Sequence, residues 1–224
     1  MIDIKDKFVR IHSSEHWKSG DSVSGSGSDA AQTRTLIAHL LHFISYNGVN
    51  CIVDWPCGDM NYQMPLVESV HSYIGVDIVP AIIENNKRKL SAYSNLSFSV
   101  GDIAKDPIPQ CDLLIVRDCF VHLPYSLVVA AISNILSYEV KFVAITTFMS
   151  RGGEPAKDVD NWMCNDYWRP MNIMREPYDL PFPFDIIVEN CTEANGIYKD
   201  KCLGIWKVDD LRNHLFNKKQ YLSI

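Results

Sequence analysis

The stretch Asn50-Cys-Ile-Val-Asp-Trp-Pro-Cys-Gly-Asp59 joins a short apolar strand to a tight polar turn. The apolar residues of 50–55 follow one another without alternation, which is typical of a strand covered on both faces in a parallel sheet. Ligands of open α/β sheets bind beyond the carboxyl ends of the strands. The residues that follow this strand are therefore the first candidates for a binding site.

Similar apolar runs recur along the chain, with helical patterns between most of them. The predicted strands cover residues 50–55, 72–77, 96–100, 112–117, 141–147, 184–189 and 201–206, and the predicted helices cover residues 29–46, 80–92 and 127–136. Residues 190–200 show no helical pattern, so the last two strands form a hairpin and one of them runs antiparallel to the rest. The sequence thus predicts an α/β fold with a Rossmann-like, seven-stranded, mostly parallel sheet, an antiparallel C-terminal hairpin and helices on both faces.

Length and composition are those of one globular domain. The chain has 224 residues, of which 47% are hydrophobic and 21% charged, and we expect a single domain over residues 1–224. Residues 1–28 end in a Gly/Ser-rich stretch and are expected to form an N-terminal loop or lid. Residues 148–183 form a long segment without periodicity, rich in Trp, Asp, Asn and Arg, and are expected to bind the substrate.

Charge, hydropathy and cysteine usage limit which classes of partner the chain can bind and indicate its cellular compartment. The chain has 27 acidic and 21 basic residues and a net charge of -6, which disfavours a nucleic-acid partner. No run approaches the ~20 apolar residues of a membrane span, and no signal peptide is visible. The seven cysteines form no CxxC pair, which predicts reduced thiols in the cytoplasm. Because structural zinc sites usually contain close ligand pairs, we predict no metal site.

An acidic residue stands at or just after the end of each of four consecutive strands: Asp54, Asp77, Asp102 and Asp118. One such residue is often only a turn or helix-capping residue. Four on one edge of the sheet predict a shared crevice that suits a positively charged ligand.

Four motifs at these strand ends carry a resemblance to a known family. They are Val53-Asp-Trp-Pro-Cys-Gly-Asp59, Tyr73-Ile-Gly-Val-Asp-Ile78, Val100-Gly-Asp-Ile103 and Arg117-Asp-Cys-Phe-Val-His-Leu123. Over about residues 30–210 the chain resembles the class I S-adenosylmethionine-dependent methyltransferases, although Pro56 and Met60 stand where other members carry glycines. It is more closely similar to microbial and viral methyltransferases associated with surface-glycan synthesis.

The resemblance implies S-adenosylmethionine as the cofactor. Asp77 would accept hydrogen bonds from both ribose hydroxyls, while Asp102 and Ile103 would hold the adenine. The expected cofactor-binding residues are Asp54, Cys57, Gly58, Asp59, Asp77, Ile78, Asp102, Ile103, Arg117 and Arg34. A nicotinamide-dependent dehydrogenase is the main rival, but its GxGxxG fingerprint is absent.

The segment after the fourth strand carries the candidate catalytic residues. A histidine is a suitable base for an alcohol acceptor, so we expect His122 to act as general base and Asp118 to orient it or to accept a hydrogen bond from the substrate. Alternatively, His122 caps the following helix or packs beneath the lid. The expected substrate-binding residues are Trp162, Tyr167, Trp168, Arg169 and Asn172. Alternatively, these aromatic residues pack their own loop, and Arg169 holds a phosphate or a nucleotide-sugar diphosphate.

The sequence thus predicts a methyltransferase that O-methylates a hydroxyl of a sugar or glycan precursor. One alternative is N- or O-methylation of another small metabolite. Another is a non-catalytic, cofactor-binding partner subunit. Nucleic-acid methylation is disfavoured by the charge and by the absence of an Asn-Pro-Pro-aromatic motif after the fourth strand.

Overall fold

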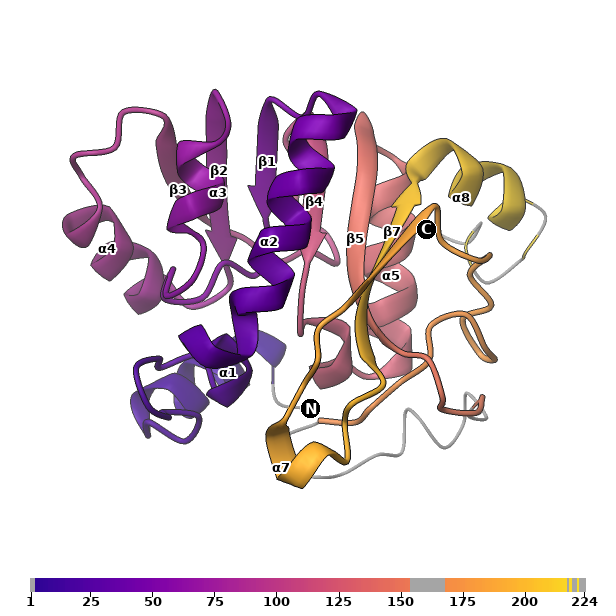
Figure 1. The fold of residues 1–224 in the computed structure, drawn as a ribbon, viewed down its shortest axis with the longest axis horizontal. Coiled ribbons are helices and arrows are strands. Elements are labelled where there is room, and N and C mark those ends of the chain that lie inside the picture. Colours follow the sequence, from indigo (N-terminus) through magenta and orange to yellow (C-terminus); the bar gives the residue numbers. More distant parts are fainter. Residues whose placement is uncertain (1–2, 154–167, 217, 219–220, 222–224) are drawn as a thin grey trace. The chain divides into compact units, whose positions relative to one another are not determined.

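The computed structural model describes residues 3–153, 168–216, 218 and 221 (Figure 1). The chain divides into two compact units. Unit 1 comprises residues 1–102 and 189–199, and unit 2 comprises residues 103–188 and 200–224. The sequence-based expectation of a single domain stays a prediction.

Unit 1 contains a parallel sheet with the strand order β3-β2-β1. Its strands are β1 (Cys51–Asp54), β2 (Ser72–Asp77) and β3 (Leu96–Val100), and its helical segments are α1 (Ile4–Ser13), η1 (Ser26–Ser28), α2 (Ala30–Asn47), α3 (Met64–Glu68), α4 (Pro80–Lys89) and α7 (Glu193–Gly196). Helix α4 packs against β2 and β3, while α2 packs against α3 and η1.

Helix α2 forms where the apolar stripe predicts it. It starts after its N-cap residue Asp29 and ends at Gly48, whose φ of 63° is the left-handed conformation that glycine adopts without strain. Leu36, Leu40 and Phe43 form its buried face. The prediction of a helix over residues 29–46 is therefore confirmed to within one residue at each end.

Residues 1–28 contain a helix that the sequence analysis missed. Helix α1 is capped by the Asp3 side chain, which accepts a hydrogen bond from the N–H of Lys5. Its Phe8 ring lies 5.9 Å from the ring of Trp17. The expectation of a loop over this whole segment is wrong for residues 4–13, because their short apolar stripe packs on a local aromatic partner.

Unit 2 contains four strands in the order β4-β5-β7-β6. They are β4 (Cys111–Val116), β5 (Val140–Phe148), β6 (Asp185–Val188) and β7 (Lys201–Lys207), and the helical segments are η2 (Phe120–His122), α5 (Tyr125–Leu136) and α8 (Val208–Leu215). Strands β4 and β5 are parallel, whereas β7 runs antiparallel to both β5 and β6. Helix α8 packs against α5, β5 and β7.

The predicted fold class is confirmed. The seven-stranded sheet is mostly parallel, and its C-terminal hairpin supplies the antiparallel strand, β7. Continuous apolar strands form the core, as Leu113 to Val116 of β4 and Val143 to Ile145 of β5 show with exposures of 2% or less. In the part of the chain that the structure describes, no helix is long and apolar enough to cross a membrane.

Candidate functional site

The ends of β1, β2 and β3 meet in unit 1 through hydrogen bonds that backbone N–H groups donate to Asp77. The N–H of Gly58 donates to Oδ2 of Asp77 at 3.1 Å. The N–H of Gly101, which precedes Asp102, donates to the carbonyl of Asp77 at 3.1 Å. The structure thus brings together three of the four acidic strand ends, and the fourth, Asp118, belongs to unit 2.

Asp77 is a buried titratable group at this junction. Its side chain is 5% exposed, and Oδ1 accepts a hydrogen bond from the N–H of Val79 at 2.9 Å. Burial raises the pKa of Asp77 to about 6, and the hydrogen bonds from Val79 and Gly58 oppose this rise. Backbone N–H groups of Val79, Gly58 and Ile78 interact with this carboxylate. A carboxylate has about four acceptor sites, so it can still accept a hydrogen bond from a ligand hydroxyl.

The raised pKa predicts how cofactor affinity depends on pH. Because the Asp77 carboxylate accepts hydrogen bonds in the ionised form, we expect S-adenosylmethionine affinity to fall as the pH is lowered through about 6. The same group affects folding in the opposite sense. Its folded-state pKa lies above its unfolded value of about 4, so its contribution to stability is complete below about pH 4 and lost as the pH rises through about 6.

Calorimetric titrations with S-adenosylmethionine between about pH 5 and pH 8 check this expectation. The Asp77→Asn variant serves as control, because its amide does not titrate. The two proteins should differ most in their pH profiles near pH 6, and parallel profiles would contradict the role of Asp77.

Asp54 lies beneath the loop that follows β1. It is 1% exposed, and its Oδ2 accepts hydrogen bonds from the Tyr73 hydroxyl at 2.8 Å and from Nε2 of Gln63 at 3.0 Å. The same Gln63 nitrogen donates to the Cys57 carbonyl at 2.8 Å. Through Gln63, Asp54 therefore helps to fix the backbone of the loop at Cys57. Its contact with the cofactor stays a prediction.

The loop of residues 55–60 keeps a glycine-like backbone despite its unusual sequence. Gly58 has φ 55°, and Met60, at a position where relatives carry glycine, has φ 58° with its side chain 2% exposed. A non-glycine residue in this conformation costs roughly 1–2 kcal/mol. Cys57 is buried in the loop, and burial raises the pKa of its thiol well above the usual value, so it is not a reactive thiolate.

The Gly/Ser-rich segment of residues 22–28, here called the serine strap, is anchored at both ends. At one end, the Ser22 hydroxyl and the Val23 N–H donate to the Asp59 carboxylate at 3.1 and 2.8 Å. At the other, the Ser26 hydroxyl donates to the Glu193 carboxylate. Ser24 Oγ also accepts the N–H of Asp59 at 3.0 Å. Asp59 therefore holds the strap, a role that the sequence did not predict.

Gly58 and Ser24 are packed so closely that their substitutions should be coupled. A Cβ on Gly58 would lie 2.5 Å from Ser24 Oγ and 3.1 Å from Ser24 Cβ. We expect Gly58→Ala to destabilise the protein and Ser24→Gly to relieve part of that loss, with a coupling energy of about 0.5–3 kcal/mol in a double-mutant cycle.

Urea unfolding of the two single variants and the double variant measures this coupling. Gly25→Ala is the matched control, because Gly25 has φ 105° but its Cβ would meet no atom within 4 Å. This control isolates the cost of a positive φ. Additive effects of the Gly58 and Ser24 substitutions would contradict the packing.

The remaining residues predicted to bind the cofactor occupy varied positions. Trp55 Nε1 donates to the Gly101 carbonyl at 3.3 Å, which places the indole beside the segment that leads to Asp102. Ile78 and Asp102 are half-buried, and Arg34 is exposed on α2. Ile103, in unit 2, is 5% exposed.

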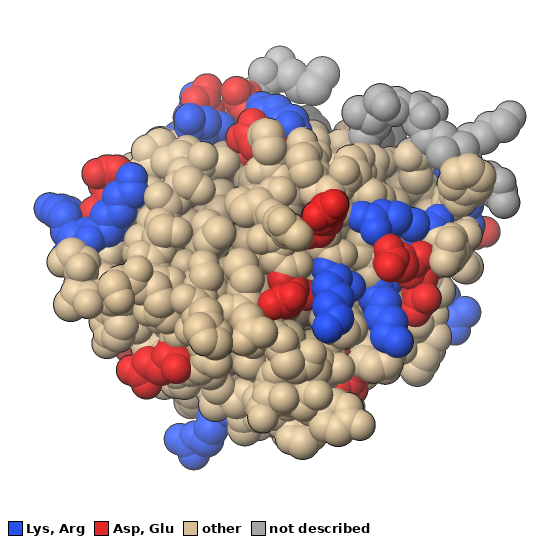
Figure 2. Space-filling model, turned by 90° about the horizontal axis from the view of Figure 1, so that it is seen from above, with Lys and Arg blue, Asp and Glu red and all other residues tan. Residues whose placement is uncertain are grey.

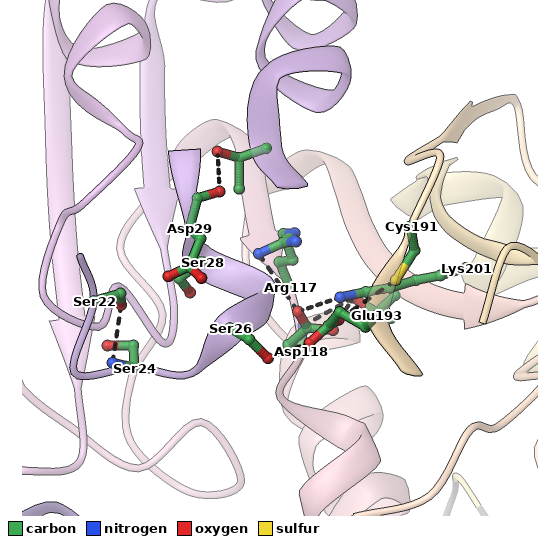
Figure 3. A network of polar contacts seen from close by, with 12 residues as sticks. Ser22, Ser24, Ser26, Ser28, Asp29, Arg117, Asp118, Cys191, Glu193 and Lys201 are labelled. Atoms are coloured by element: carbon green, nitrogen blue, oxygen red, sulfur yellow. Dashed lines mark hydrogen bonds and ion pairs between the residues drawn. The ribbon is translucent and has the colours of Figure 1, made fainter. Parts of the chain in front are cut away.

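In unit 2, Asp118 lies directly after β4 in a cluster with two buried cations. Lys201 Nζ, from the start of β7, is 2.6 Å from Asp118 Oδ2, and Arg117 Nη1 is 3.4 Å from the same oxygen (Figure 3). The Asp118 N–H donates to Thr146 Oγ1 at 2.8 Å. Asp118 has φ 51°, a left-handed conformation.

This cluster determines the ionisation of Asp118. Burial favours the neutral acid, but the charges of Lys201 and Arg117 outweigh burial and hold the pKa of Asp118 well below its usual range. His122, in η2, acts in the same direction. Asp118 is therefore a permanently ionised hydrogen-bond acceptor at neutral pH and is too weak a base to take a proton.

The predicted substrate-binding residues divide into two groups. Trp162 and Tyr167 lie outside the described residues. Trp168 packs edge-on against Phe148, with ring centroids 6.1 Å apart. Its neighbour Arg169 is 6% exposed.

Arg169 and Asn172 hold backbone segments of unit 2. The Arg169 guanidinium donates to the Leu123 carbonyl at 2.8 Å and to the Tyr178 hydroxyl at 2.7 Å. Asn172 Nδ2 donates to the carbonyls of Met149 and Arg151 at 3.2 and 3.1 Å. These contacts favour a role in fixing the loop after His122 and the start of the long segment, and substrate binding by either residue stays a prediction.

Sequence reasoning missed several polar residues of these clusters. Lys201 is the clearest case, because a lysine that opens an otherwise apolar strand run is a signal for a buried charge partner. Gln63, Ser22 and Thr146 carried no comparable signal. In the described ranges, no group of three or more His, Cys, Asp or Glu residues could hold a metal ion, and the six described cysteines are thiols rather than disulfides.

Figure 2 shows one face of the molecule, on which Lys and Arg side chains lie next to Asp and Glu. On this face the described basic residues do not gather into a patch of one sign. Mixed charge of this kind is not the surface expected for binding a phosphate backbone.

Comparison with known sequences gives a match to part of the chain. No family model matches the chain. An uncharacterized RNA methyltransferase of Halalkalibacterium halodurans is 33% identical over 76 residues, which are 33% of this chain. This chain spans 17% of the length of that curated relative.

Solved structures of low sequence identity share the architecture. Phosphoethanolamine N-methyltransferase 1 of Haemonchus contortus superposes with a TM-score of 0.63 at 14% identity, covering 96% of this chain and 53% of that one. N-methyltransferase NodS of Bradyrhizobium japonicum, in complex with S-adenosylhomocysteine, gives 0.62 at 12% identity, covering 90% and 98%. The chain has the fold of the S-adenosylmethionine-dependent methyltransferases.

A third structure agrees with this conclusion. Magnesium protoporphyrin IX methyltransferase from Synechocystis PCC 6803, with bound S-adenosylmethionine, gives a TM-score of 0.51 at 16% identity and covers 66% of this chain and 77% of that one. The resemblance found in the sequence is thus confirmed at the level of the methyltransferase fold. The association with surface-glycan synthesis stays a prediction.

Proposed function

We propose that this chain is an S-adenosylmethionine-dependent methyltransferase that O-methylates a hydroxyl of a sugar or glycan precursor. The proposal is carried by the hydrogen bond from the Gly58 N–H to Asp77 Oδ2. This contact joins the first and second motifs at the carboxyl ends of β1 and β2, where open α/β sheets bind nucleoside ligands.

The donor and acceptor groups of unit 1 fit the cofactor's chemistry. Asp77 offers two carboxylate oxygens for the ribose hydroxyls. Asp102 would accept a hydrogen bond from the adenine amino group, with Ile78 in apolar contact. The carboxylates of Asp54 and Asp59 favour a ligand that carries an ammonium and a sulfonium, and they would repel the pyrophosphate of a nicotinamide cofactor.

Residues of unit 2 supply the proposed chemistry. When bound, S-adenosylmethionine provides an electrophilic methyl group on its sulfonium. His122 takes the proton of the acceptor hydroxyl, because an aliphatic alcohol is a poor nucleophile at neutral pH. The ionised Asp118 accepts a hydrogen bond from the acceptor or from the protonated imidazole and keeps it oriented. Trp168 would offer an apolar ring face to a sugar.

RNA is a second candidate acceptor, because the partial sequence match is to a protein named as an RNA methyltransferase. The net charge of -6 and the mixed charges of the face in Figure 2 weigh against it. Two further alternatives are N- or O-methylation of another small metabolite and a non-catalytic, cofactor-binding subunit.

A screen with S-adenosylmethionine labelled on its methyl group tests the proposal. The acceptors are nucleotide sugars, methyl glycosides, small amines and total RNA, each assayed separately. We expect label in the sugar arm. Label only in RNA or in an amine would replace the acceptor class. Calorimetric titrations with NAD and with S-adenosylmethionine run in parallel. Binding of NAD without binding of S-adenosylmethionine would contradict the assignment of the cofactor.

A further inference from the structure

Lys201 occupies an unusual position for a lysine. It is the first residue of β7, paired with Phe148 at the end of β5, and it is 4% exposed. Its Nζ donates to Asp118 Oδ2 at 2.6 Å, as the close-up of this cluster shows (Figure 3). Two other strands thus hold Asp118. Thr146 of β5 hydrogen-bonds with its N–H and with Oδ1, and Lys201 of β7 donates to Oδ2.

The arrangement around Asp118 is costly for folding alone. An enclosed ion pair loses much of its Coulomb energy to desolvation and is often no more stable than a well-packed apolar pair. The left-handed φ of 51° at Asp118 adds backbone strain. Strain and buried charge of this kind collect at functional sites.

The three contacts fix different parts of Asp118. Thr146 accepts the backbone N–H at 2.8 Å, while Lys201 and Arg117 share Oδ2 at 2.6 and 3.4 Å. Lys201 is the nearer cation. The Asp118 side chain is still 27% exposed, so part of the carboxylate faces outward where an acceptor can reach it.

We propose that Lys201 is a positioning residue for methyl transfer, which locks the Asp118 carboxylate in one orientation at the end of β4, beside His122. The inference rests on the proposed function, because the acceptor hydroxyl is the group that Asp118 orients. Lys201 acts only through Asp118 and transfers no proton. A displaced carboxylate leaves the acceptor misaligned, and a misplacement of about 1 Å costs on the order of 10²-fold in rate.

Four variants separate this role from a purely structural one. Lys201→Met removes the charge at similar length, and Lys201→Arg keeps it. The double variant Asp118→Asn/Lys201→Met removes both charges and retains a residue type that tolerates a left-handed backbone. Lys207→Met is the matched control, because Lys207 ends the same strand and is exposed.

For the acceptor with the highest turnover in the screen, we expect Lys201→Met to lower kcat by about 10²-fold with little change in KM. Lys201→Arg should recover much of this loss, and Lys207→Met should match the wild type. The double variant removes the carboxylate that faces Arg117 as well as Lys201, so it is compared with Asp118→Asn rather than with the wild type. Its turnover should equal that of Asp118→Asn, because Lys201 acts only through Asp118. A double variant slower than Asp118→Asn, or a fully active Lys201→Met variant, would overturn the proposal.

A second measurement does not depend on turnover. In protein labelled with carboxyl-¹³C aspartate, the signal lost in Asp118→Asn identifies Asp118. We expect it to stay at the ionised position down to a lower pH in the wild type than in Lys201→Met, where Arg117 is the remaining buried cation at this carboxylate. Identical titrations would refute the role of Lys201. A wild-type chain that methylates none of the acceptors but shows this difference would instead refute the proposed function alone.

Discussion

Replacing His122 by alanine is expected to lower kcat for methyl transfer by about 10²–10⁴-fold, the range that a positioned general base contributes. We expect the imidazole rather than Asp118 to act as the base, because Lys201 and Arg117 hold the pKa of Asp118 well below its usual range and keep it weakly basic. The dissociation constant of S-adenosylmethionine should stay unchanged. Single-turnover assays with labelled donor measure the first quantity, and calorimetry measures the second.

The matched control is His214→Ala. His214 is an exposed histidine of unit 2, with its Nε2 3.0 Å from the Asp179 carbonyl. It should retain wild-type turnover. A His122→Ala variant with wild-type kcat would remove His122 as the base and leave the capping of the following helix as its role. A loss of turnover accompanied by a clear fall in melting temperature would indicate a folding defect rather than a loss of the catalytic group.

The second large effect is expected at Asp77. Its replacement by alanine leaves two ribose hydroxyls without an acceptor and the Gly58 N–H without its partner, a loss of roughly 1–3 kcal/mol of binding free energy. This corresponds to a rise in the dissociation constant of about 5- to 150-fold. Calorimetric titration at pH 7.5 or above measures it with the wild-type carboxylate ionised.

Two companion variants sharpen the Asp77 test. Asp77→Asn keeps one carbonyl acceptor and should lose less affinity than alanine. Glu84→Ala removes an exposed carboxylate of α4, which pairs with Lys87, and should bind as the wild type does. Unchanged affinity in Asp77→Ala would exclude this carboxylate from the cofactor site.

The fold was predictable because its strands are continuous apolar runs. The apolar runs at β4 and β5 are long enough to predict buried strands, and the short gap between β6 and β7 predicts the hairpin. Helix α1 was missed because its few apolar positions are interrupted by charges and depend on a contact with Trp17. The left-handed backbone at Met60 could not be predicted either, because a residue with a side chain disfavours that conformation.

The site was predictable where a residue's role follows from its place at a strand end. Asp77 and Gly58 were both expected at the cofactor site, and the structure joins them by a hydrogen bond, although their contacts with a cofactor stay predictions. Lys201 was not found, because its partner Asp118 is 83 positions away in the sequence and only the antiparallel return of β7 brings the two together. Likewise, the hydrogen bonds between Asp59 and the serine strap could not be predicted, because the strap's sequence shows composition but not contacts.

The loop after β1 has one further consequence. Both backbone groups of Cys57 and of Gly58, and the N–H of Asp59, are already hydrogen-bonded to Val76, Gln63, Asp77, Asn86 and Ser24. A ligand that arrives there meets a surface whose shape is set beforehand, so little conformational entropy remains to be lost on association. Substitutions at the buried residues Gln63 or Asn86 would then weaken binding by making the free loop more disordered.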